Sequence, residues 1–271
     1  MQKVASLRYG VIFKKAFSDP VIFTAFVKAV LGIELKIDHV ETEKSFDTQI
    51  GPIKTSFDLF AEDKEQRIIV DIQHVRYPDH YHRFLNYHCV ALLEQIVNAR
   101  DYRPPLQVFT IVVLTSGDKH GVDVATIEFD PKDLRGRPLK EIPHKIMFLC
   151  PKYVNENTPA AYREWMRLID DSLDEEIEAS QYPDPYLQQV LEKIRAESVS
   201  PSDRARMFDE YGEEQVQREK YQEGRKAATT EIITTMYRNG QSPELIAQMI
   251  SLSLRDVMEV LGQSDSPTDQ T

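Results

Sequence analysis

Three polar residues in one short stretch of the chain have the types and spacing that phosphodiester chemistry requires. Asp71 and Gln73 are two residues apart, and Asp58 lies 13 residues before Asp71. Carboxylate and amide oxygens suit Mg²⁺ or Mn²⁺, and a few carboxylates plus a substrate phosphate are the usual Mg²⁺ arrangement. The stretch therefore predicts a divalent-metal site in which Asp58 and Asp71 bind the ion and Gln73 contacts the ion or its water.

These residues must be positioned by a hairpin over residues 54–73. Apolar and polar residues alternate along its second half, and Asp63–Gln66 supplies a polar turn. With the two middle residues of this turn at its centre, Asp58 faces Asp71 across an antiparallel ladder, with Cβ atoms about 5 Å apart. Two carboxylates so placed repel each other unless a cation lies between them. The alternative is that both are unrelated surface residues on a hairpin of different register.

The other elements expected around the hairpin alternate between helices and strands. A helix is predicted over 8–17, and a second one begins at Pro20 behind an Asp19 cap and ends at Gly32. A strand over 35–43, a helix over 81–100 and strands over 106–114, 122–129 and 145–150 complete the pattern. The nearly continuous apolar run 106–114 is typical of a central strand covered on both faces. The expected fold class is therefore α/β, with a central mixed sheet flanked by helices.

The composition of the chain changes after Pro151, and we therefore predict four segments. Residues 1–154 form the domain with the hairpin, and 155–223, with 18 acidic and 8 basic residues, form an acidic helical connector that includes a helix over 170–178. Residues 224–262 form three helices resembling a helix-turn-helix, and 263–271 form a disordered tail. Because Arg255 is the only base of the last helix, a packing or homo-oligomerisation module is the alternative to DNA contact there.

The net charge, the cysteines and the absence of long apolar runs restrict the classes of protein to which this chain can belong. The 271 residues carry a net charge of −11, which argues against a protein that simply coats nucleic acid, although the acidity is concentrated in 155–223. Cys89 and Cys150 make no disulfide framework. No signal-peptide pattern and no apolar run of about 18 residues occurs, so a cytoplasmic protein without a membrane partner is expected.

The order of several short motifs resembles the PD-(D/E)XK nuclease family transposases, also called Rpn-type recombination-promoting nucleases. The residues that carry the resemblance are Phe13-Lys14-Lys15-Ala16-Phe17, Ser56-Phe57-Asp58, Ile69-Val70-Asp71-Ile72-Gln73, Tyr81-His82-Arg83 with Tyr87, and Asp101-Tyr102, followed more loosely by Gly224, Gly240, Ser242 and Ile246. The resemblance covers about residues 7–115 and, loosely, 220–262. It implies a restriction-endonuclease-like core and divalent-metal-dependent cleavage of DNA, linked to recombination or mobile elements.

Carried over by position, Asp58 matches the first acid of the family motif and Asp71 the acid of (D/E)-x-K. Gln73 stands where the wider superfamily has lysine, a variant that this subfamily commonly shows. The implied roles are metal ligation by Asp58 and Asp71 and orientation of the attacking water by Gln73. One position departs from the family: an acid usually precedes the Phe-Lys pair by three residues, where this chain has Gly10. Glu34 and Glu62 are the candidate substitutes.

Three cations are further candidates for substrate binding. Lys14 and Lys15 are expected to contact phosphate, and Arg83 to stabilise transition-state charge or orient a carboxylate. The alternatives are a solvated helix face for the lysines and a surface ion pair for Arg83. The alternative function for the whole chain, motivated by Gly10, is a catalytically decayed relative that binds DNA or a protein partner.

Overall fold

A computed structural model of the chain describes residues 1–46, 55–75, 77, 79–96 and 102–264. By its internal contacts the chain divides into two compact units, Met1–Glu210 and Tyr211–Thr271. These differ from the segments expected from the sequence, whose boundaries lay after residues 154 and 223. Within the described residues, no helix is both long and apolar enough to cross a membrane.

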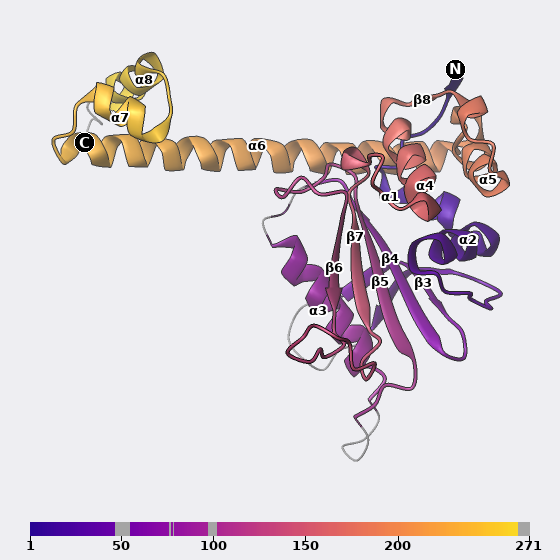
Figure 1. Cartoon of the computed structure of the whole chain (residues 1–271). Coiled ribbons are helices and arrows are strands. Elements are labelled where there is room, and N and C mark those ends of the chain that lie inside the picture. Colours follow the sequence, from indigo (N-terminus) through magenta and orange to yellow (C-terminus); the bar gives the residue numbers. More distant parts are fainter. Residues whose placement is uncertain (47–54, 76, 78, 97–101, 265–271) are drawn as a thin grey trace. The chain divides into compact units, whose positions relative to one another are not determined.

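The first unit is built on a mixed six-stranded sheet with the order β2-β3-β4-β5-β7-β6. Its strands are β2 (Glu41–Phe46), β3 (Thr55–Glu62), β4 (Gln66–Gln73), β5 (Gln107–Leu114), β6 (Val124–Glu128) and β7 (Lys145–Leu149). The pairs β4–β5 and β5–β7 are parallel, and the other neighbours are antiparallel. The α/β class with a mixed sheet is therefore confirmed (Figure 1). The strand expected over 35–43 is wrong for most of its length, because β2 begins only at Glu41.

The hairpin of β3 and β4 has the register expected from its turn. Phe60 pairs with Ile69, and the Asp63 amide donates to the Gln66 carbonyl at 3.0 Å. The Asp63 carboxylate accepts from the amides of Glu65 and Gln66, both at 2.8 Å. An aspartate that binds backbone amides just beyond it fixes a tight turn, which explains why the register follows from the sequence.

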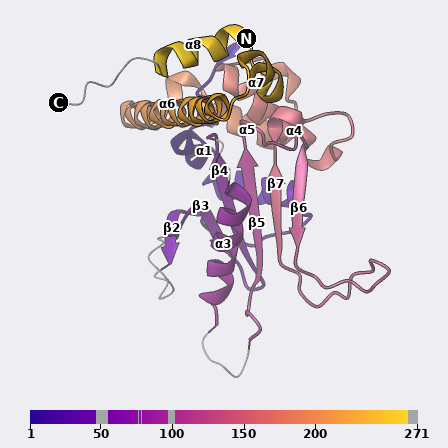
Figure 2. The ribbon, with the colours of Figure 1, turned by 90° about the vertical axis from the view of Figure 1, so that its left-hand side faces the viewer.

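Helices cover both faces of the sheet (Figures 1 and 2). Alternate residues of β5 belong to different cores: Ile111 and Val113 pack in one, and Val112 in another. The first core contains side chains of α1 (Gly10–Phe17), α2 (Pro20–Leu31), α4 (Ala160–Asp171) and α5 (Pro185–Ile194), whereas α3 (His80–Leu93) packs on the opposite face. The bounds of α2 follow the predicted signals, with Asp19 accepting from the Val21 amide and Gly32 at φ +71°.

The segment expected to be an acidic connector supplies part of the first core. On α4 the buried side chains Tyr162, Trp165, Met166 and Ile169 recur at helical spacing. The acids of α4 therefore lie outside its buried apolar stripe. The helix expected over 170–178 is wrong, because α4 ends at Asp171 and the short strand β8 (Glu176–Ile177) pairs with β1 (Gln2–Lys3). Glu175 at φ +62° makes the turn, and Ile177 is buried.

The second unit is helical. The helix α6 (Pro201–Arg238) is continuous, so the boundary expected at 223/224 does not interrupt it. Glycine inside a helix costs only about 1 kcal/mol relative to alanine, and good helix formers surround Gly224. The helices α7 (Pro243–Ile250) and α8 (Leu254–Ser264) follow, and Ile246 and Val257 pack against Ile233 of α6. The tail expected over 263–271 is wrong at its start, because α8 extends to Ser264, and residues 265–271 lie outside the described residues.

His88 of α3 is a buried base whose surroundings disfavour its charged form. Its ring stacks on Phe129 with centroids 5.0 Å apart, and its Nδ1 lies 2.9 Å from the Thr110 hydroxyl. Burial, with a smaller contribution from His144, lowers the pKa of His88 to about 3. Since the pKa falls from 6.5 on folding, stability is fully present above pH 6.5 and decreases as the pH falls towards 3.

We therefore expect His88 to contribute to the pH dependence of unfolding in acid. Between pH 6 and 4 the free energy of unfolding of the wild type should fall by up to about 1.4 kcal/mol per pH unit through His88. His88→Gln should remove that part of the slope in urea titrations at several pH values. His82→Gln, at an exposed position of the same helix, should keep the wild-type slope, and an unchanged slope in His88→Gln would contradict the assignment.

Candidate active site at the open end of the hairpin

The two acids lie where the ladder of the hairpin ends. The last backbone pair is Leu59–Val70. Beyond it the Asp58 amide donates to Oδ1 of Asp71 at 3.0 Å, and the Ile72 amide donates to Oδ2 of Asp58 at 3.0 Å. The expected juxtaposition of Asp58 and Asp71 is present, and each carboxylate accepts a hydrogen bond from the backbone of the opposite strand.

Burial governs the protonation of this pair. Asp71 is only 4% exposed, and burial, followed by the negative charge of Asp58, raises its pKa well above the ordinary 3.8. Burial also raises the pKa of Asp58, against the Ile72 amide and the charge of Lys14, which lower it. A low-dielectric site disfavours two adjacent carboxylate charges, and a cation at this place relieves that cost.

Two side-chain oxygens on the same face of β4 receive no hydrogen bond from the described residues. Oδ2 of Asp71 and Oε1 of Gln73 are buried and have no hydrogen-bond partner within the described part of the chain. The Gln73 amide is oriented by its Nε2, which donates to the Val75 carbonyl at 2.7 Å. Buried acceptors that lack a donor are costly, so both oxygens fit a cation or an ordered water.

The nearest cation to Asp58 is Lys14. Its Nζ lies 2.9 Å from Oε1 of Glu43 and 3.7 Å from Oδ1 of Asp58. Burial lowers the pKa of Lys14, but the hydrogen bond to Glu43 and the charges of Asp58, Glu43 and Glu210 outweigh it, so the pKa is above the ordinary 10.5. The sequence pattern alone did not indicate that Glu43 lies at this site. Glu43 stands on β2 between the residues that pair with Leu59 and Phe57, and therefore opposite Asp58.

The other two predicted cations are placed differently. Lys15 points away from the acids, since its Nζ lies 3.5 Å from Oδ2 of Asp203 and donates to the Ser198 carbonyl. Consecutive helical residues diverge by about 100°, which separates the two lysines. The guanidinium of Arg83 lies 5.3 Å from the ring centroid of Tyr87. Its positive charge partly offsets the increase that burial causes in the pKa values of Asp58 and Asp71.

A carboxylate from far along the chain lies against Gly10. The Gly10 amide donates to Oε2 of Glu210 at 2.7 Å, and the Val11 amide donates to Oε1 at 2.9 Å. A Cβ added to Gly10 would lie 3.7 Å from both oxygens. No local pattern signals Glu210, because it is 200 residues from Gly10 and lies in an acidic stretch.

The two substitutes expected for the missing acid are engaged elsewhere. Glu34 pairs with Lys28 at 2.7 Å, and Glu62 pairs with Arg67. Glu210 is therefore the carboxylate that lies where a side chain of residue 10 would begin. Burial raises the pKa of Glu210, against the two amides that lower it.

A search for groups of three or more His, Cys, Asp or Glu side chains with metal-ligand geometry finds none, within the residues that the structure describes. The ring nitrogens of His74 and His88 contact the hydroxyls of Thr115 and Thr110. Asp101, one of the residues of the family resemblance, lies outside the described residues.

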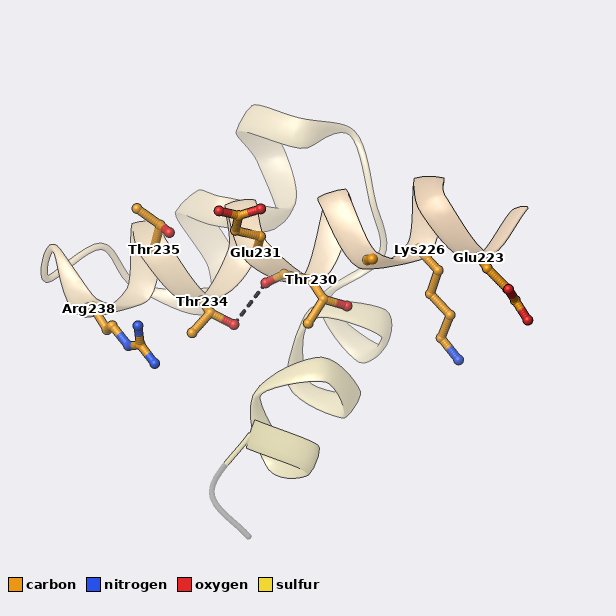
Figure 3. A pocket seen from close by; sticks show the side chains of 8 residues that line it. Glu223, Lys226, Thr230, Glu231, Thr234, Thr235 and Arg238 are labelled. Atoms are coloured by element: carbon orange, nitrogen blue, oxygen red, sulfur yellow. Dashed lines mark hydrogen bonds between the residues drawn. The ribbon is translucent and has the colours of Figure 1, made fainter. Parts of the chain in front are cut away.

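A separate hollow lies on the second unit and contains none of the predicted site residues. It is lined by Glu223, Lys226, Ala227, Thr230, Glu231, Thr234, Thr235 and Arg238 of α6 (Figure 3). The Thr234 hydroxyl there donates to the Thr230 carbonyl at 2.8 Å, a bond within the helix itself. Its polar groups therefore do not form a set comparable to that of the hairpin.

Comparisons with known families, with curated proteins and with solved structures find no match to this chain.

Proposed function

We propose that the chain is a divalent-metal-dependent endonuclease that hydrolyses phosphodiester bonds of DNA, in a restriction-endonuclease-like fold, and that it serves recombination or mobile elements. The observation that carries the proposal is a pair of buried oxygens beside Asp58, Oδ2 of Asp71 and Oε1 of Gln73, which have no partner among the residues that the structure describes. Hard oxygen donors in a buried, negatively charged place fit Mg²⁺ or Mn²⁺.

The side chains of this site have distinct tasks. Asp58 and Asp71 would hold the ion, which supplies stabilisation of phosphate charge and a hydroxide nucleophile at neutral pH. The Gln73 amide, fixed through Val75, directs Oε1 as an acceptor for a hydrogen bond from the attacking water. Lys14 provides a positive charge next to Asp58 for a substrate phosphate.

Cleavage of supercoiled plasmid tests the proposal directly. The purified full chain should nick plasmid in Mg²⁺ or Mn²⁺ and not in EDTA. Asp58→Asn should reduce the rate at least about 100-fold, because it removes one charge from the ion site yet keeps an oxygen for the Ile72 amide. Asp38→Asn removes an exposed acid of the same unit and should leave the rate unchanged.

Two results would count against an enzyme. Equal nicking by wild type and Asp58→Asn would point to a contaminating nuclease. No nicking by a folded wild type, over linear, supercoiled and single-stranded DNA, would favour the alternative of a non-catalytic DNA-binding or protein-interaction module.

A further inference from the structure

The first turn of α1 donates hydrogen bonds to the side chain of Glu210. The first amides of a helix have no partner within the helix, and this end carries a partial positive charge. Glu210 accepts from two of these amides, those of Gly10 and Val11, with one oxygen each. A carboxylate with this geometry fixes the helix end both by charge and by direction.

The same helix carries Lys14. Residues four apart lie on one face of a helix, so Lys14 lies one turn beyond Gly10 on the same face, and the Gly10 amide donates to Glu210. The charge of Glu210 contributes to the raised pKa of Lys14, and the charge of Asp58 contributes to that of Glu210. Glu210 therefore belongs to the same electrostatic group as Asp58, Glu43 and Lys14.

We propose that Glu210 is a positioning residue of the nuclease site: it anchors the first turn of α1 and thereby holds the Lys14 ammonium beside Asp58. This inference rests on the proposed function. A second observation points to the same place, because Oδ2 of Asp71 is buried without a partner among the described residues. A lysine released from its position would compete with a divalent ion for that oxygen.

The proposal predicts weaker metal binding when Glu210 loses its charge. Glu210→Gln removes a negative charge near Asp58 and leaves one amide of α1 facing an NH₂ group, so both effects disfavour a bound cation. In calorimetric titrations of the full chain with Mn²⁺, we expect about tenfold weaker binding. Asp209→Asn removes an exposed acid at the preceding residue and should remain within twofold of wild type.

Amide hydrogen exchange tests, in the absence of metal, whether Glu210 holds the first turn of α1. In the wild type the amides of Gly10 and Val11 should exchange slowly, and in Glu210→Ala at least tenfold faster. Asp209→Asn should keep the slow rates. Rates in Glu210→Ala equal to those of the wild type would overturn the anchoring role.

Moving the carboxylate to residue 10 gives a matched rescue. A Cβ at Gly10 would lie 3.7 Å from the Glu210 oxygens, so Gly10→Asp places a carboxylate next to the volume that Glu210→Ala vacates. The double variant Gly10→Asp/Glu210→Ala should regain most of the Mn²⁺ affinity. Gly10→Ala/Glu210→Ala also replaces the glycine but adds no charge, and it should not regain the affinity.

The outcomes separate the two proposals. If the wild type binds Mn²⁺ and nicks DNA but Glu210→Gln binds Mn²⁺ within twofold of wild type, the role of Glu210 is overturned and the nuclease stands. If the folded wild type neither binds Mn²⁺ nor nicks DNA, the proposed function falls and the role of Glu210 falls with it.

Discussion

Asp71→Asn is expected to abolish metal-dependent nicking while it raises the thermal stability of the metal-free protein. Asparagine keeps an oxygen for the Asp58 amide, so the hydrogen bond at the hairpin end is retained. It also removes the ionisable group whose pKa is raised on folding, first by burial and then by the negative charge of Asp58. Under the proposed function Asp71 is a metal ligand, so we expect at least about 1000-fold slower nicking. We expect the free energy of unfolding of the metal-free protein to rise by about 1 kcal/mol at pH 7.

The sign of the stability effect depends on pH. Because the pKa of Asp71 is raised on folding, its proton stabilises the folded state fully below the unfolded value of 3.8, and this contribution is lost as the pH rises through the folded value. The advantage of Asp71→Asn, measured as a shift in melting temperature in EDTA, should therefore be present at pH 7 and vanish below about pH 3.8. A variant less stable than wild type at pH 7 would contradict the electrostatic account.

Trp165→Ala is expected to have the largest effect on folding. The Trp165 ring lies 5.4 Å from the centroid of Phe26 and 6.0 Å from that of Phe17, and it is 5% exposed. Removing a buried aromatic side chain typically costs about 3–5 kcal/mol. A loss of this size, measured by urea unfolding, would show that α4 belongs to the core that supports α1 and the sheet.

Tyr186→Ala is the matched control, because this aromatic residue of α5 is 41% exposed and should change stability by less than about 0.5 kcal/mol. By the same reasoning, a chain that ends at residue 154 should fail to fold, since it lacks both α4 and α5. A stable fragment 1–154, or a change below about 1 kcal/mol in Trp165→Ala, would favour the connector expected from the sequence.

The parts of the site that could be predicted from the sequence are those fixed by local chemistry. The Asp63 turn sets the register that brings Asp58 to Asp71, and alternation along β4 places Gln73 on the same face. The Asp19 cap and Gly32 fixed the bounds of α2 in the same local way. In each case neighbours in the sequence are also neighbours in space.

The parts that could not be predicted depend on contacts between distant residues. Glu210 has no local signal that separates it from the other acids of α6, and Glu43 is defined by the pairing of β2 with β3. The acidic composition of 155–223 concealed the apolar stripe of α4, because net charge does not record which face of a helix is buried. The acidic composition likewise gives no signal that α4 ends at Asp171.

The hydrogen bonds that join Asp58 and Asp71 to the opposite strand also affect how this site would change over evolutionary time. The amides of Asp58 and Ile72 each require a side-chain oxygen at these positions, whether or not the protein cleaves DNA. Under the proposed function, a descendant released from selection for cleavage would therefore be expected to accept asparagine at either position far more readily than alanine or valine. In sequences that share this hairpin, an asparagine pair would mark lost chemistry with a retained fold.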